Sequence, residues 1–279
     1  MELSKMKKPA FIVSLALLAI IGSSAAFLTS HDYADNTFYV AKVDLTIEEN
    51  FDENKTLSAG EMIQKQPWVK NTGNVDQLFF VEVYVPCMET TLLDSAGQRI
   101  TPSGFGGTPQ TADDYRQTTE IFNLLADGTP TKAYITKPTV NNDVTQNLEF
   151  SYNKGSTTAS GWYYMRQTQN QVIFHNKQGF QDGTYNAYLF GYNTAVVAGK
   201  NTIPIFDNLQ LRSMIDAEID SELITQVTIT AYTIQANEFN ITGLTGDGTV
   251  TTPYTESDLE HIYQVYENKA ITAQGGVSP

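Results

Sequence analysis

Cysteine is nearly absent from this chain, since Cys87 is the only one among 279 residues. One cysteine cannot form an intramolecular disulfide, so the fold cannot depend on the disulfide framework typical of small secreted domains. Basic residues are also few, with 17 Lys and Arg against 31 Asp and Glu and a formal net charge of −14. This charge opposes binding to nucleic acid and to anionic lipid headgroups. We therefore expect no nucleic-acid partner, and stability that comes from packing or assembly.

Catalytic motifs are lacking as well. The three histidines lie far apart, and neither His175 nor His261 belongs to an H-E-x-x-H zinc helix. The sequence contains no G-x-S-x-G elbow and no glycine-rich phosphate loop. His31, with Asp32 and Asp35 close by, could ligate a metal. We expect no catalytic residue, no metal and no cofactor, and a metal site around His31 is the alternative.

Long apolar runs are missing except for one near the start, from Ala10 to Ile21. This run is about half the roughly 20 residues that a membrane-spanning helix needs. Three lysines precede it and Ser24-Ala25-Ala26 follows it, an order typical of a signal peptide with a small-x-small cleavage site. We expect signal peptidase to cut between Ala26 and Phe27, which removes residues 1–26 and leaves no stable membrane span. An uncleaved anchor helix is the alternative.

Alternation of apolar and polar residues dominates the remaining sequence and predicts half-buried β-strands. It runs from Ala41 to Glu48, from Met62 to Lys70, and from Leu78 to Val85, where both faces are apolar enough to be partly covered. The turn Asn71-Thr72-Gly73-Asn74 predicts a hairpin between the last two. Further strands are predicted at 161–165, 171–174, 185–193 and 226–236. Short strands at this spacing predict an all-β, antiparallel sandwich.

The stretch from about residue 90 to 160 has a weaker pattern and many glycines and prolines. We interpret it as a loop-rich insertion that carries a helix over Asp113 to Leu125. A second helix is predicted over Ser213 to Leu223, because Ile215, Ile219 and Leu223 recur every four residues.

A third helix is predicted near the C-terminus, where Ser257-Asp258-Leu259-Glu260 fits a capping box. Its apolar stripe would comprise Leu259, Ile262, Tyr263 and Tyr266. The chain is thus predicted to contain a signal peptide over 1–26, a sandwich domain over 27–250, and a C-terminal helix and tail over 251–279.

Three other features have a structural and a functional interpretation. Cys87 ends an apolar strand and is predicted to be a small buried thiol, with a reactive thiol as the alternative. Acidic residues over 216–222 fit a solvated helix face better than a calcium loop, because they lack the spacing of an EF-hand. The aromatic residues are predicted to form core and cross-strand pairs, with a carbohydrate platform as the alternative. They are Trp162, Tyr163, Tyr164, Phe174, Tyr185, Tyr188, Phe190 and Tyr192.

Several short segments are specific in their order and spacing. They are Ser24-Ala25-Ala26-Phe27, Asp35-Asn36-Thr37-Phe38, Val43-Asp44-Leu45-Thr46, Leu57-Ser58-Ala59-Gly60 and Val69-Lys70-Asn71-Thr72-Gly73-Asn74-Val75-Asp76. Together they resemble the TasA and camelysin-like proteins, which Firmicutes export with a SipW-type signal peptidase. Two later segments, 198–207 and 231–236, resemble a subgroup of gut clostridia. The resemblance covers about residues 1–90 and 160–240.

This resemblance implies a jelly-roll-like sandwich in a protein that is secreted into the extracellular matrix or held at the cell surface. For TasA it implies biofilm fibres, in which an N-terminal strand of one subunit completes the sheet of the next. Cleavage would free such a strand here, with Phe27, Leu28 and Phe38 as its apolar residues, and allow it to add to an exposed sheet edge. This contact does not close on itself, so it predicts head-to-tail filaments.

Three alternatives remain open. The segment that begins at Phe27 can instead fold back as the first strand of its own domain. Camelysin-like proteins are often labelled metalloendopeptidases, so a secreted protease is the second alternative. A monomeric surface adhesin that binds glycans or a host protein is the third.

Overall fold

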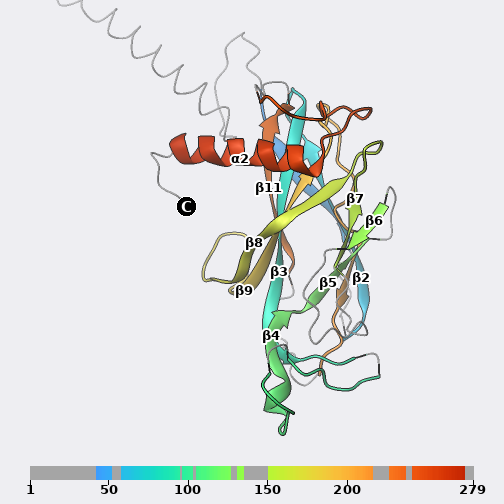
Figure 1. Ribbon diagram of the computed structural model, residues 1–279, viewed down its shortest axis with the longest axis vertical. Coiled ribbons are helices and arrows are strands. Elements are labelled where there is room, and N and C mark those ends of the chain that lie inside the picture. Colours follow the sequence, from blue (N-terminus) through green and yellow to red (C-terminus); the bar gives the residue numbers. More distant parts are fainter. Residues whose placement is uncertain are drawn as a thin grey trace, which may run out of the picture.

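The computed structural model shows two β-sheets packed face to face, with one long helix across the outer face of the larger sheet (Figure 1). The expectation of an all-β sandwich is confirmed. The structure describes residues 42–51, 58–94, 96–102, 105–126, 131–134, 150–215, 226–236 and 241–273.

The smaller sheet has four strands, all antiparallel. Their order is β1 (Leu45–Phe51), β2 (Met62–Asn71), β10 (Asn208–Leu211) and β5 (Phe122–Leu125). Every second residue of β2, from Ile63 to Asn71, is buried. This is the alternation that predicted the strand, because successive side chains point to opposite faces of a sheet.

The larger sheet has seven strands and is mixed, because β7 and β8 pair in parallel while the other pairs are antiparallel. Its order is β11 (Thr228–Gln235), β3 (Gln77–Thr91), β9 (Gly183–Tyr192), β8 (Trp162–Phe174), β7 (Ser151–Lys154) and β6 (Thr131–Tyr134), and β4 (Arg116–Glu120) pairs with the second half of β3. The predicted strands at 161–165 and 171–174 are parts of one strand, β8, and those at 185–193 and 226–236 correspond to β9 and β11 to within two residues at each end.

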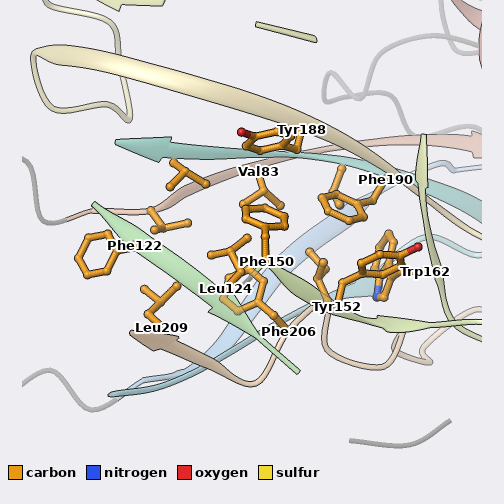
Figure 2. Close-up of a cluster of buried hydrophobic side chains, with 14 of the residues drawn as sticks. Val83, Phe122, Leu124, Phe150, Tyr152, Trp162, Tyr188, Phe190, Phe206 and Leu209 are labelled. Atoms are coloured by element: carbon orange, nitrogen blue, oxygen red, sulfur yellow. The ribbon is translucent and has the colours of Figure 1, made fainter. Parts of the chain in front are cut away.

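The centre of the fold is β3, which is buried on both faces as its sequence predicted. Phe79, Val81 and Val83 point into the core between the sheets, whereas Leu78 and Phe80 point outward. Figure 2 shows the inner core, where Val83, Tyr188 and Phe190 of the larger sheet face side chains of the smaller sheet such as Leu124 and Leu209.

The predicted aromatic residues are part of this packing. Trp162 and Tyr185 are fully buried, and Trp162 meets Tyr192 edge to face with 5.0 Å between ring centroids. Phe190 makes an edge-to-face pair with Tyr152 at 5.3 Å. Such pairs add stability beyond the area that they bury. The interpretation as core is confirmed for five of the eight predicted aromatic residues, whereas Tyr163, Tyr164 and Phe174 are half-buried.

The outward-facing residues at one end of β3 are covered by α2 (Glu256–Ala273). The predicted stripe is confirmed, since Leu259, Ile262 and Tyr263 are buried and Tyr263 meets the ring of Phe80 at 5.1 Å. The capping box lies two residues before the predicted one. The Thr255 hydroxyl accepts the Asp258 N–H at 3.2 Å, and the Asp258 carboxylate accepts the Thr255 N–H at 2.9 Å.

The predicted hairpin between β2 and β3 is wrong. The turn at Asn71–Asn74 is present, but it carries the chain from one sheet to the other, so β2 pairs with β1 and β10 while β3 pairs with β9 and β11. The physical reason is that both faces of β3 are apolar and need cover from both sides. That cover is available in the larger sheet, between the smaller sheet and α2.

The predicted helix over Asp113–Leu125 is also wrong. A single 3₁₀ turn, η1 (Asp113–Tyr115), is followed at once by β4 and β5. Phe122 and Leu124 belong to the inner core, and β5 pairs with β10 at the margin of the smaller sheet. Parts of the range 90–160 that the sequence indicated as an insertion therefore build both sheets. Of the predicted helix at Ser213–Leu223, residues 213–215 are not helical, and the rest lies outside the described residues.

Candidate functional site

The residues predicted to carry export and assembly lie outside the described residues. They are Ala26, Phe27, Leu28 and Phe38, and the same holds for His31. The described chain starts at Lys42, where the N-terminal segment joins the sandwich. The candidate site is therefore this junction together with the sheet edge that continues from it.

The junction is an extension of the β1–β2 ladder beyond the end of β2. The carbonyl of Asp44 accepts the N–H groups of Thr72 and Gly73 at 3.1 and 3.2 Å. The Lys42 carbonyl accepts the Asn74 N–H at 3.1 Å, and the Lys42 N–H donates to the Asn74 side chain at 2.6 Å. Residues 42–44 thus continue the line of β1 towards the end of the sandwich.

Asn71 organises the turn that holds this junction. Its side chain is fully buried, and its amide nitrogen donates to the carbonyls of Val75 at 2.8 Å and Val196 at 2.7 Å. Its amide oxygen accepts the Gly73 N–H at 3.0 Å and the Gln77 side-chain amide at 2.8 Å. The Asn-Thr-Gly motif that carries the family resemblance therefore has a structural role here, which is to shape the turn.

Gly73 is required at this place because of close approach. A Cβ atom there would overlap the carbonyl oxygen of Lys42 and the side chain of Gln77. Any larger residue would push the incoming chain off the turn.

The outer edge of β1 carries backbone groups that pair with no other strand in the described part of the chain, although the Leu45 N–H donates to the Asp44 carboxylate at 3.0 Å. The odd-numbered residues of β2 bond to the segment after β9: the Val69 carbonyl accepts the Thr202 N–H at 2.8 Å, and the Asn71 N–H donates to Lys200 at 2.9 Å. The even-numbered residues of β2 therefore face β1, as the Asp44–Thr72 bond also requires. It follows that the N–H and C=O groups of Leu45, Ile47, Glu49 and Phe51 point away from β2.

A second edge runs along the same side of the sandwich. β11 is the last strand of the larger sheet, and it lies beside β1, which is the last strand of the smaller one. The core is incompletely covered between them, since Leu45, Ile229 and Ala231 pack against it and are only half-buried. Ile47, two residues after Leu45, is also half-buried. We refer to these two edges with Leu45, Ile47, Ile229 and Ala231 as the open seam.

Charged side chains surround β1. Glu48 accepts hydrogen bonds from Lys70 at 3.0 Å and from the Trp68 indole at 3.1 Å, and these two bonds hold the pKa of Glu48 below its ordinary value. Glu49 pairs with Lys65, which is 8 % exposed on its side chain. Charges on an edge strand discourage unselective pairing with other strands, so the seam favours a partner that fits it.

The described residues contain no group of three or more His, Cys, Asp or Glu side chains placed to hold a metal ion. His175 is exposed and lies 3.7 Å from Asp182. His261 lines an open cleft of about 730 Å³ between α2 and β8, where Arg166 pairs with Glu260 and Glu267. The prediction that the protein has no catalytic residue stays a prediction.

Cys87 is buried at 3 % exposure, as predicted. Near it the structure brings together a polar cluster that the sequence did not indicate. Glu120 accepts hydrogen bonds from the hydroxyl of Tyr188 and, at 2.8 Å, from the amide of Asn186. Arg212 donates to the Thr119 hydroxyl at 2.8 Å and to the Glu120 carbonyl at 2.9 Å.

Burial is the main cause of the pKa shifts in this cluster. It raises the pKa of Tyr188, and the neighbouring Glu120 raises it further. It lowers the pKa of Arg212 to about 10, although Glu120 works in the opposite direction. Glu120 and Arg212 are 4 % and 2 % exposed, so a substrate cannot reach them and the cluster is structural.

Comparison with protein-family models, with curated proteins and with solved structures gave no match. The resemblance to TasA and camelysin-like proteins and the jelly-roll arrangement that it implies therefore stay predictions. Of the helices in the described part of the chain, none is both long and apolar enough to cross a membrane.

Proposed function

We propose that this protein is an exported structural subunit of the cell surface or extracellular matrix, and that its copies join head to tail. The N-terminal segment of one copy, with Phe27, Leu28 and Phe38, adds to the open seam of the next. Signal peptidase acts first, because cleavage after Ala26 frees the segment.

The observation that carries this proposal is the open seam itself. Outward-pointing backbone groups on β1 can pair with an added strand, which is the general mode of strand addition to a sheet edge. The half-buried Leu45, Ile47, Ile229 and Ala231 beside them would lose exposed apolar area when an added strand brings its own apolar side chains.

The geometry of the junction favours addition of the N-terminal segment to a neighbouring copy over its pairing with β1 of the same chain. Residues 42–44 are held in line with β1 by their bonds to Thr72, Gly73 and Asn74. To pair with the outer edge of its own β1, the preceding segment would have to reverse direction next to this fixed ladder. Continuing outward requires no such reversal.

The first experiment compares residues 27–279 with residues 39–279 by negative-stain electron microscopy and by light scattering after size exclusion. We expect filaments from the longer chain and monomers from the shorter one, and a synthetic peptide of residues 27–41 should block filament growth. A longer chain that stays monomeric at all salt and pH conditions would overturn the proposal and favour the segment folding back.

A second experiment tests the seam with a matched pair of variants. Glu49→Pro removes an N–H group that points to the outer edge, so it should abolish filaments while the monomer stays folded. Glu49→Ala keeps that N–H group and loses the same pairing with Lys65, so it should still assemble. Equal assembly of both variants would show that the outer edge of β1 is not the acceptor.

A further inference from the structure

The tip of the hairpin between β8 and β9 holds a lysine ammonium among three aromatic rings. The Lys177 Nζ lies 3.8 Å from the ring centre of Phe174, 4.5 Å from that of Phe180 and 5.4 Å from that of Tyr84. All three distances lie within the roughly 6 Å over which a cation is attracted to an aromatic face. These three rings form what we call the aromatic cage.

The cage is built by three separate parts of the chain. Tyr84 comes from β3, Phe174 from the end of β8, and Phe180 from the connecting loop. The rings support one another, since Phe180 meets both Tyr84 and Phe174 edge to face at 4.8 Å. Tyr185, which is fully buried, forms the base and meets Phe180 at 5.7 Å.

A turn folds Lys177 back over the rings. The Phe180 N–H donates to the Lys177 carbonyl at 3.0 Å, and Gly179 between them has a φ of 82°. This left-handed conformation favours glycine. The loop is fastened on its other side by the Asn176 N–H, which donates to the Asp182 carboxylate at 2.7 Å.

The wall of the cage has a carboxylate behind it. The Tyr84 hydroxyl donates to Glu82 at 2.9 Å, and the Tyr232 hydroxyl donates to the same carboxylate at 2.9 Å. Glu82 is 8 % exposed, so its negative charge is poorly screened by water. A hydrogen bond to a carboxylate also makes the Tyr84 ring richer in electrons, which strengthens its attraction for a cation.

The ammonium of Lys177 has the three rings as its near neighbours. Within the described ranges no carboxylate forms an ion pair with the Lys177 ammonium, and Lys177 is exposed. The rings are therefore its partners, and they offer a face rather than directed hydrogen-bond acceptors. A primary ammonium keeps its three N–H donors, and an aromatic cage satisfies them poorly compared with water.

We propose that the aromatic cage is a binding site for quaternary ammonium groups, and that Lys177 is a tethered occupant which such a ligand displaces. A quaternary ammonium carries a full charge without N–H donors and is more weakly hydrated, so it gains more from the rings than Lys177 does. The acidic charge of the chain, −14 in total, attracts cations in general. The proposal does not depend on filament assembly.

The test uses the full-length protein, with tetramethylammonium and choline as probes, and calorimetry together with tyrosine fluorescence as readouts. Wild type should bind both probes saturably. Lys177→Ala should bind them about tenfold more tightly or better, because a tethered group competes at an effective concentration in the millimolar range. Lys200→Ala, which removes an exposed lysine from another loop, should match wild type.

Two controls distinguish binding of a cation by the aromatic cage from nonspecific binding to an apolar surface. The neutral isostere of choline, 3,3-dimethylbutanol, should not bind, because it has the same shape without the charge. Lys177→Ala combined with Phe180→Ala should lose the gain. Binding to phosphatidylcholine vesicles would assign the group to a lipid headgroup, and binding to free choline alone would assign it to a soluble ligand.

The proposal is overturned by any of three results. These are no saturable binding to a folded Lys177→Ala variant, equal binding of choline and its neutral isostere, or unchanged binding after Phe180→Ala.

Discussion

The side-chain amide of Asn71 donates a hydrogen bond of 2.7 Å to the carbonyl of Val196, and so joins the end of β2 to the loop after β9. These two residues are 125 positions apart in the chain. The same side chain also bonds to Val75, Gly73 and Gln77. A single buried side-chain amide thus makes four hydrogen bonds where the chain passes from the smaller sheet to the larger one.

Asn71→Asp should destabilise the fold strongly. The carboxylate keeps the shape of the amide and can still accept, but it cannot donate to the Val75 and Val196 carbonyls. We expect the free energy of unfolding to fall by about 3 kcal/mol, because buried acceptors lose their donor and face a charge. Urea denaturation followed by circular dichroism measures this.

The control is Asn74→Asp, which lies in the same turn but is exposed and keeps the oxygen that accepts the Lys42 N–H. Its effect should stay below about 1 kcal/mol. Equal losses for the two variants would contradict the role assigned to Asn71.

Gly161→Ala should also be costly. A Cβ atom at this position would overlap backbone atoms of Gly155, which cannot move aside as a flexible side chain can. We expect a loss of about 3 kcal/mol in the free energy of unfolding. Gly106→Ala provides the comparison, because nothing lies within 4 Å of its Cβ position and its φ is not left-handed. A small effect at Gly161 would show that the close pass of these two segments can relax.

The stability of the protein should fall steeply above pH 10. Burial, followed by the charge of Glu82, raises the pKa of Tyr232 to about 12 from its ordinary 10.0. Burial raises the pKa of Tyr152 to about 12 as well, and those of Tyr84, Tyr188 and Tyr263 are also raised. Above pH 10 these phenols ionise in the unfolded chain but stay neutral in the fold. Their stabilisation is therefore complete below pH 10 and is lost as the pH rises towards 12.

Each such tyrosine contributes up to about 1.4 kcal/mol per pH unit to this fall. The pKa of the buried Arg212 is lowered to about 10, so this residue makes stability rise with pH over the same range. It is one group, whereas five tyrosines make stability fall. Urea midpoints measured between pH 8 and pH 11 give the slope. Tyr232→Phe should reduce this slope by the contribution of one titrating group, which is up to about 1.4 kcal/mol per pH unit. A slope that does not change would contradict the raised pKa of Tyr232.

The carboxylate of Asp258 should contribute more to the free energy of unfolding near neutral pH than in acid. Burial raises its pKa, but hydrogen bonds from the N–H groups of Thr245, Thr255 and Gly246 lower it more, so that its pKa lies below the ordinary 3.8. The stabilisation is present above pH 3.8 and is lost as the pH falls below it.

Asp258→Asn should therefore lower the free energy of unfolding by about 1–2 kcal/mol at pH 6, and by less at pH 3. Thermal or urea unfolding at the two pH values measures the difference. Asp247→Asn serves as the control, because Asp247 is an exposed turn residue with no part in the helix cap. A deficit for Asp258→Asn that is as large at pH 3 as at pH 6 would contradict the charge-based explanation.

The strands were the predictable part of this fold because their signal is local. Alternation over Met62–Lys70 and the doubly apolar run Leu78–Val85 depend on neighbouring residues only. The pairing of these strands was not predictable, since the turn Asn71–Asn74 has the same sequence signature whether it joins two strands of one sheet or two sheets. The helix predicted over Asp113–Leu125 failed for a related reason. Ile121, Phe122 and Leu125 fit a helical spacing, but Phe122 and Leu124 also fit a strand.

The candidate site was predictable only in part. The sequence indicated an apolar N-terminal segment and a strand after it, but the open seam depends on which of the strands end at the sheet margins. Leu45, Ile229 and Ala231 pack against the same core, and β11 comes to lie beside β1, only through that arrangement. The aromatic cage is similar, because Tyr84, Phe174 and Phe180 come from separate elements and meet only after β3, β8 and β9 have paired.

The position of β3 also bears on how the chain is made. Its neighbours β9 and β11 come much later in the sequence, and the pair Glu82 and Tyr232 spans 150 positions. A fold with so many distant pairings forms slowly. For a chain that crosses a membrane N-terminus first, β3 emerges well before either partner, with apolar side chains on both faces. If the chain is exported as proposed, β3 is therefore exposed to aggregation during translocation, and a chaperone that binds apolar segments would protect it.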